Sequence, residues 1–141
     1  MLIGLYEYSI DLKGRLFIPA KFREGKNKTF IVTIGLDKCL YVYPFEKWYK
    51  LEERLENLPF KDKTEERAFK RILLSGATEV KADFQGRILL PNNLRQYAIL
   101  KNNVVIIGVS NRIEIWSKDL WDKYNKSTKP LFTKHASSLE I

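Results

Sequence analysis

Two short stretches of the sequence each place an arginine four residues after an aspartate. Residues 9–19 read SIDLKGRLFIP and residues 81–91 read KADFQGRILLP. Both contain Asp-x-x-Gly-Arg, then three apolar residues and a proline. The planar guanidinium of Arg15 or Arg87 can pair with a phosphate or with O6 and N7 of guanine, and Asp11 or Asp83 is close enough in sequence to hold it.

The same spacing also has a purely structural interpretation. Asp11 and Arg15 flank a turn, as Asp83 and Arg87 do, so each pair could simply close on itself. An exposed ion pair of this kind contributes only about 0–1 kcal/mol. The two interpretations are compatible, because a carboxylate can hold an arginine in the orientation that a ligand needs.

The similarity between the two stretches extends into a longer internal repeat. At an offset of 72 residues, the matched pairs are Asp11 and Asp83, Gly14 and Gly86, Arg15 and Arg87, Pro19 and Pro91, Phe22 and Leu94, and Arg23 and Arg95. After one inserted residue, the pairs are Gly35 and Gly108, Leu40 and Ile113, Val42 and Ile115, Tyr43 and Trp116, and Trp48 and Trp121. A single insertion in a loop is what a duplicated fold tolerates.

Each repeat has the pattern of four short strands, one short helix and one closing helix. The strands are predicted at residues 6–10, 16–18, 29–34 and 39–43, and at 78–82, 88–90, 103–109 and 112–116. Gly14 and Gly86 can supply the positive φ of a type I turn with a glycine bulge. Pro19 and Pro91 end the second strands and favour short helices at 20–24 and 92–98.

The predicted boundaries give one domain built from two repeats. The first repeat with its closing helix covers residues 1–58, a connecting helix lies in 59–77, and the second repeat with its closing helix covers 78–125. The tail, 126–141, loses periodicity and is expected to be flexible or to dock on another subunit. Because four short strands cannot close their own sheet, we expect the repeats to interleave their hairpins into one barrel with pseudo-two-fold symmetry.

The charge balance favours a polyanionic partner. The 141 residues contain 25 Lys and Arg against 17 Asp and Glu, a net charge of +8, which suits nucleic acid or an anionic membrane surface. Within residues 11–28 the cations Lys13, Arg15, Lys21, Arg23, Lys26 and Lys28 face only Asp11 and Glu24. The second repeat offers Arg87 and Arg95, with Gln85, Asn92 and Asn93 at positions where the first repeat has basic or apolar residues. The first repeat is therefore the stronger candidate for a DNA-facing surface.

The residue types do not suggest an enzyme. His135 is the only histidine and lies in the tail, and no metal-ligand cluster, glycine-rich phosphate loop or nucleophile with a nearby base is evident. Cys39, the only cysteine, is expected to be a buried and inert thiol. We expect no catalytic residue, cofactor, metal or small-molecule substrate. Without a leader or a membrane span in the sequence, we expect the cytoplasm.

These motifs together resemble the MraZ family of bacterial transcriptional regulators. The resemblance covers residues 1 to about 125 and rests on Asp11–Arg15, Asp83–Arg87, the stretch 15–23, Leu74–Ala77 and Gly35–Asp37. It implies an α+β fold, an AbrB-like double-psi swapped-hairpin barrel with flanking helices. It also implies a nucleoid-associated, ring-like homo-oligomer such as an octamer, which binds double-stranded DNA at direct repeats upstream of its own operon in the division and cell-wall gene cluster.

A second class of function stays open from the sequence alone. A basic oligomeric scaffold would bind other proteins rather than specific DNA, through aromatic-rich edges such as Trp48, Tyr49, Trp116 and Trp121. These aromatic residues are also suited to a core or to subunit contacts. The two classes differ in whether the protein retains one DNA sequence selectively.

Overall fold

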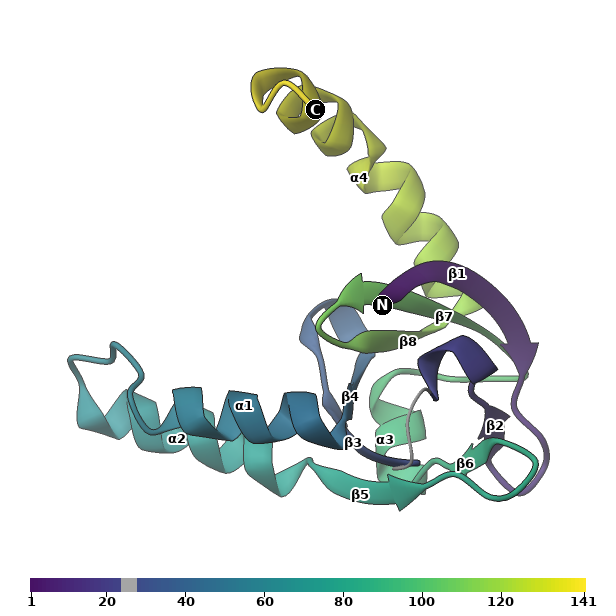
Figure 1. The fold of residues 1–141 in the computed structure, drawn as a ribbon. Helices are drawn as coiled ribbons and strands as arrows, with labels where there is room; N and C mark the ends of the chain where they lie inside the picture. Colours follow the sequence, from purple (N-terminus) through teal and green to yellow (C-terminus); the bar gives the residue numbers. More distant parts are fainter. Residues whose placement is uncertain (24–27) are drawn as a thin grey trace.

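The computed structural model describes residues 1–23 and 28–141 (Figure 1). In these ranges the strands are β1 (Leu2–Ser9), β2 (Arg15–Phe17), β3 (Thr29–Ile34), β4 (Leu40–Pro44), β5 (Thr78–Lys81), β6 (Arg87–Leu89), β7 (Asn103–Ser110) and β8 (Ile113–Ser117). The α-helices are α1 (Phe45–Leu55), α2 (Lys63–Ser75), α3 (Asn92–Tyr97) and α4 (Lys118–Ser138). Short 3-10 helices span Ala20–Phe22 and Leu36–Lys38.

The two repeats exchange their strands. β1 pairs with β7 of the second repeat, and β5, its counterpart, pairs with β3 of the first. The repeats also meet where β4 pairs with β8 and where β2 pairs with β6. All of these pairings are antiparallel. The strands of one repeat pair with the other repeat in the same way as their counterparts do, so the pseudo-two-fold symmetry expected from the duplicated sequence is present.

The predicted fold is confirmed only in part, because no closed barrel is found among the described strands. Their pairings give a six-stranded sheet in the order β1-β7-β8-β4-β3-β5 and a separate two-stranded ribbon, β2-β6. The α+β class and the exchange between repeats agree with the prediction. β1 and β5 lie at opposite edges of the larger sheet and do not pair with each other within the described residues.

The core lies between the ribbon and the larger sheet. Leu16 and Ile88, the central residues of β2 and β6, are fully buried. They belong to one cluster with sheet residues that include Val32, Val42, Ile106 and Ile115. Because side chains alternate along a strand, burial of the central residue of each short strand turns its two neighbours outward.

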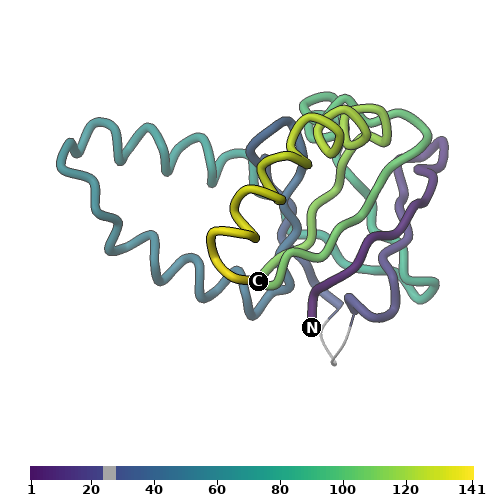
Figure 2. The backbone as a smooth tube through the Cα atoms, turned by 90° about the horizontal axis from the view of Figure 1, so that it is seen from above, coloured from purple at the N-terminus to yellow at the C-terminus, as the bar shows by residue number. Residues whose placement is uncertain are grey.

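Two helical projections leave the body in different directions (Figure 1). α1 and α2 lie alongside each other and extend to one side, as Figure 2 also shows from above. α1 buries Trp48 and Leu55, whereas no residue of α2 is fully buried. Among the described residues, none of the helices combines the length and the apolar character that crossing a membrane requires.

The closing helix of the second repeat is longer than expected. The predicted end of this helix at residue 125 is wrong, because α4 continues through the predicted tail to Ser138. Pro130 lies inside this helix; it removes one backbone donor, but its fixed φ is compatible with helical geometry. The hydroxyls of Ser127 and Thr128 donate to the carbonyl of Tyr124 in the turn before it. The first short helix, predicted at 20–24, ends at Phe22, and Glu24 lies outside the described residues.

Candidate nucleic-acid interface

The first Asp-x-x-Gly-Arg turn is organised by Asp11. Its Oδ1 accepts the backbone N–H groups of Arg15 at 2.8 Å and Lys13 at 3.0 Å, and its Oδ2 accepts Nε of Arg15 at 2.7 Å. The backbone N–H of Gly14 donates to the carbonyl of Asp11 at 3.0 Å, and Gly14 has φ of +85°. The predicted type I turn with a glycine in the left-handed region is therefore confirmed.

The second turn repeats this arrangement atom for atom. Asp83 Oδ1 accepts the backbone N–H groups of Gln85 and Arg87, both at 2.9 Å, and Oδ2 accepts Nε of Arg87 at 3.0 Å. Gly86 has φ of +87°. In both turns the aspartate thus fixes the backbone and the base of the arginine side chain together.

These contacts keep both aspartates charged. The backbone N–H of Arg15 is the largest cause that holds the pKa of Asp11 below its usual value, with the Arg15 guanidinium adding to it. The backbone N–H of Arg87 does the same for the pKa of Asp83. A charged carboxylate is a stronger acceptor for the arginine Nε than a neutral one.

The ribbon brings the two arginines onto one face. Arg15 lies opposite Leu89, and Phe17 lies opposite Arg87. Since Leu16 and Ile88 point into the core, these four residues form the outward face of the ribbon, with the arginines at diagonal positions. A two-stranded ribbon of this kind is narrow enough to enter the major groove of B-DNA. We call this surface the ribbon face.

Only the base of each arginine is held by the protein. Arg15 and Arg87 are bonded through Nε, and within residues 1–23 and 28–141 their terminal nitrogens, Nη1 and Nη2, have no hydrogen-bond partner. The Arg15 and Arg87 side chains are 34% and 30% exposed. Each guanidinium therefore combines a fixed base with two free terminal nitrogens, whose N–H groups can take part in a bidentate contact to guanine or phosphate.

Arg23 and Arg95 pack against the opposite repeat. Arg23 donates from Nε to the carbonyl of Ile18 at 2.7 Å, and Arg95 donates from Nε to that of Leu90 at 3.0 Å. A Cβ added to Gly86 would lie 2.6 Å from Cζ of Arg23, and one added to Gly14 would lie 2.8 Å from Cζ of Arg95. Each guanidinium thus rests on the glycine of the other repeat's turn.

This exchange places four arginines around one ribbon. Arg15 and Arg95 lie at the first turn, and Arg87 and Arg23 lie at the second. Two of the four come from each repeat, so the placement of arginines does not favour the first repeat over the second. The sequence could not indicate this arrangement, because it depends on which repeat supplies the neighbour of each glycine.

The lysines of the predicted cluster are more scattered. Lys13 is exposed within the first turn. Nζ of Lys21 lies 3.9 Å from the position of a Cβ on Gly4, so this side chain is directed toward β1. Lys28 is exposed just before β3, and Lys26 lies outside the described residues. Of the predicted cationic residues, the structure thus gathers the four arginines with Lys13 and sets Lys21 apart.

The sequence interpretation missed the apolar residues at the tips of both turns. Leu12 and Phe84 occupy the position directly after the aspartate and are almost fully exposed. Leu89, on the ribbon face, is 57% exposed. The sequence could have indicated Leu12 and Phe84, because each is an apolar residue inside a tight turn, where a side chain is expected to be exposed.

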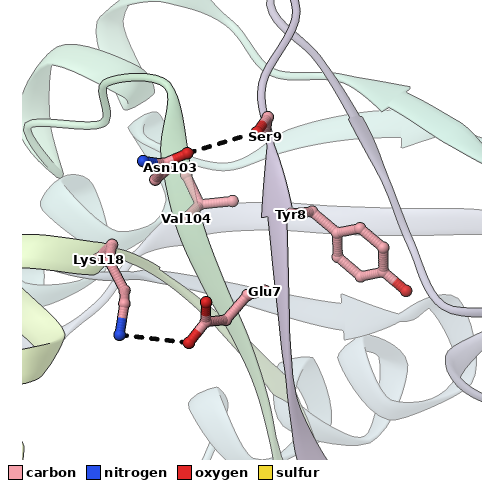
Figure 3. Close-up of a pocket in the computed structure, with 6 residues that line it drawn as sticks. All are labelled: Glu7, Tyr8, Ser9, Asn103, Val104 and Lys118. Atoms are coloured by element: carbon pink, nitrogen blue, oxygen red, sulfur yellow. Dashed lines mark hydrogen bonds and ion pairs between the residues drawn. The ribbon is translucent and has the colours of Figure 1, made fainter.

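A polar hollow lies elsewhere on the described surface. It measures about 300 Å³ and lies between β1, β7 and the start of α4. An ion pair of 3.2 Å between Lys118 and Glu7 crosses one end, and Ser9 bonds to Asn103 near the other (Figure 3). None of the arginine and lysine residues predicted to bind DNA lines this hollow.

The described residues include one buried thiol. Cys39 is buried, as predicted, and burial raises the pKa of its thiol to about 12. Within residues 1–23 and 28–141, His, Cys, Asp and Glu do not form a group of three or more that could hold a metal ion.

Comparison with known proteins matches both repeats to one family. The family described as "MraZ protein, putative antitoxin-like" matches residues 1–72 and 73–140. The chain is 52% identical over 139 residues to a transcriptional regulator MraZ of Desulforamulus reducens, covering 99% of this chain and 97% of that protein. It is 50% identical over 140 residues to that of Caldanaerobacter subterraneus, with the same coverage, and 56% identical over 124 residues to that of Pelotomaculum thermopropionicum, covering 88% and 85%. The duplicated turns, the exchanged strands and these matches place the chain in the MraZ family.

Proposed function

We propose that this protein regulates transcription by binding specific double-stranded DNA through the ribbon face. The observation that carries the proposal is the state of Arg15 and Arg87. Both are fixed at Nε by an aspartate, both keep Nη1 and Nη2 free among the described residues, and both lie on one narrow outward surface. The relatives named transcriptional regulator MraZ support the same function.

We infer that the target is a set of short direct repeats upstream of its own operon and that a ring-like oligomer binds them. Exposed apolar side chains on both helical projections support self-association. Phe69 and Ile72 on α2 are 44% and 62% exposed, and Phe132 on α4 is 72% exposed. Phe69 and Ile72 lie three residues apart on α2 and so share one face, and contiguous exposed apolar patches mark contacts with other chains. Head-to-tail contact between two different surfaces closes into a ring when the rotation allows it. The AbrB-like barrel is part of this proposal, with the strand exchange between repeats as its support.

The test measures binding to the DNA directly upstream of the protein's own coding sequence. Fluorescence anisotropy compares this fragment with a scrambled fragment of equal length and composition, for the wild type, Arg15→Ala and Arg87→Ala. Each good bidentate contact to a base contributes about 1–3 kcal/mol of discrimination. We therefore expect each variant to lose most of the preference for the upstream fragment, since every subunit then lacks one of its two base-contacting guanidinium groups.

Two further variants separate the hydrogen-bond geometry of the guanidinium from its positive charge. Arg15→Lys keeps the positive charge but loses the planar fork, so it should bind both fragments with similar affinity. Arg54→Ala removes an exposed arginine on α1 and should behave like the wild type. Unchanged preference in Arg15→Ala and Arg87→Ala, with normal melting, would show that the two motifs serve only the fold.

Salt dependence provides an independent measurement. Phosphate contacts release counterions, and the logarithm of the binding constant falls with the logarithm of salt by about 0.9 per phosphate. Several subunits, each with four arginines around its ribbon, should give a steep slope. A constant affinity from low to physiological salt would argue for a partner other than DNA.

A further inference from the structure

The two turn tips carry the most exposed internal apolar side chains. Leu12 has a relative exposure of 104% and Phe84 of 91%. Within the described residues, only the C-terminal Ile141 is as exposed among large apolar side chains. Both repeats thus place a bulky apolar residue at the same turn position, directly after the aspartate that anchors the arginine.

The fold does not use these two side chains. The backbone on either side of each tip is fixed by Asp11 or Asp83, which accepts two backbone N–H groups, and by a glycine with positive φ. Neither Leu12 nor Phe84 belongs to a core cluster of the described residues. Since the turn needs no particular side chain at this position, the apolar character of both residues requires another explanation.

The surrounding charges indicate which kind of partner covers the tips. Lys13 and Arg15 adjoin Leu12, and the guanidinium of Arg95 rests on Gly14 of the same turn. An apolar protein surface pressed onto Leu12 would have to desolvate these cations without compensating them. A DNA groove supplies both kinds of contact, because phosphates neutralise the cations and the thymine methyl group meets an apolar side chain.

We propose that Leu12 and Phe84 are specificity-determining residues that contact thymine 5-methyl groups next to the bases contacted by Arg15 and Arg87. The inference rests on the proposed DNA binding and deepens it. In this arrangement each turn reads two features of the major groove, a hydrogen-bonding edge through its arginine and a methyl group through its tip. The second feature involves only apolar contact, so hydrogen bonds alone would not reveal it.

The experiment removes the methyl group from the DNA and the apolar group from the protein. The upstream fragment is prepared with thymine and, in a second version, with deoxyuracil, which differs only by the missing methyl. Affinities for both are measured for the wild type, Leu12→Ser and Phe84→Ser. Phe84→Leu is the conservative variant. Leu139→Ser removes an exposed leucine that caps the C-terminal end of α4, and this end of the helix lies away from the ribbon (Figure 1).

For the wild type we expect deoxyuracil to weaken binding about threefold to fourfold for every thymine methyl group that the protein covers. Each serine variant should bind the thymine fragment more weakly and should show a smaller difference between the two fragments. The double serine variant should show no difference. Phe84→Leu and Leu139→Ser should keep the wild-type difference.

Three outcomes would overturn the inference or its basis, and they differ from one another. If the wild type prefers the upstream fragment but binds its thymine and deoxyuracil versions equally, the methyl contact is refuted and DNA recognition stands. If the serine variants change the mass of the oligomer in mass photometry but keep the thymine preference, the tips contact another copy instead. If the wild type binds scrambled DNA as well as the upstream fragment, the proposed function itself fails.

Discussion

Replacement of Gly14 by alanine tests whether the two repeats brace each other at their turns. Gly14 has φ of +85°, and a Cβ there would lie 2.8 Å from Cζ of Arg95. That guanidinium is not free to move without loss, because its Nε donates to the carbonyl of Leu90 at 3.0 Å. The backbone of Leu90 also donates to the carbonyl of Gly14 at 2.9 Å. The change therefore acts on both repeats at once.

Two contributions set the expected loss of stability. An alanine in the left-handed region costs roughly 1–2 kcal/mol relative to glycine. Displacing Arg95 breaks its hydrogen bond, a further loss of about 0.5–1.5 kcal/mol. We expect Gly14→Ala to lower the free energy of unfolding by about 2–3 kcal/mol, and each kcal/mol lowers the melting temperature of a protein of this size by about 4 °C.

Urea denaturation of a double-mutant cycle measures the second contribution separately. In the wild-type background Arg95→Ala removes the hydrogen bond to Leu90. In the Gly14→Ala background that bond is already broken, so Arg95→Ala should have little additional effect. Gly76→Ala is the matched control, because Gly76 ends α2 with φ of −80° and the nearest atom to an added Cβ is at 3.5 Å.

Any of three results would show that the two repeats do not brace each other at this turn. A wild-type midpoint for Gly14→Ala would show that the turn relaxes freely. Strictly additive losses for Gly14→Ala and Arg95→Ala would show that the glycine and the arginine act independently, so the repeats would not brace each other at this point. A loss in Gly76→Ala equal to that in Gly14→Ala would attribute the effect to any Gly→Ala change.

Acid titration, thiol reactivity and one residue with positive φ provide three further tests. The pKa values of Asp11 and Asp83 are lowered in the folded protein. The stability that the two charged carboxylates contribute is therefore present above their unfolded pKa of about 3.9 and is lost as the pH falls below it. The Asp11→Asn/Asp83→Asn variant should lose less stability than the wild type when the pH is lowered from about 5 to about 2, as measured by urea denaturation at each pH. Cys39, whose thiol pKa burial raises to about 12, should react with a thiol reagent at neutral pH only after the protein is unfolded in urea. Ile99 has φ of +54° and is half exposed. Because glycine adopts this backbone conformation without strain, Ile99→Gly should stabilise the protein by about 1 kcal/mol in thermal melts. A lower melting temperature would show that the isoleucine side chain makes a compensating contact.

The sequence by itself determined the local chemistry of both turns. Aspartate, glycine and arginine at fixed spacing within five residues suffice to specify a hydrogen-bonded turn with positive φ at Gly14, because the hydrogen bonds that Asp11 accepts all come from residues of the turn itself. The internal repeat likewise predicted the strands, since the alternation of apolar and polar residues and the prolines that end strands are local features. The connecting helix was predictable from its cap, where Asp62 accepts the backbone N–H of Thr64.

The tertiary structure decided what these turns face. That Arg95 rests on Gly14 and Arg23 on Gly86 follows from strand exchange between repeats, which no local pattern encodes. The position of Arg15 and Arg87 on one face depends on the register of β2 against β6, because a slip of one strand by one residue would turn that strand's arginine to the opposite face. The sequence did not reveal the helical tail because its apolar residues lack a helical period, and Pro130, which disfavours a helix interior, is accommodated in the folded helix. Contacts within a few residues are set by the chain's own geometry, whereas contacts between the two repeats exist only after both have folded together.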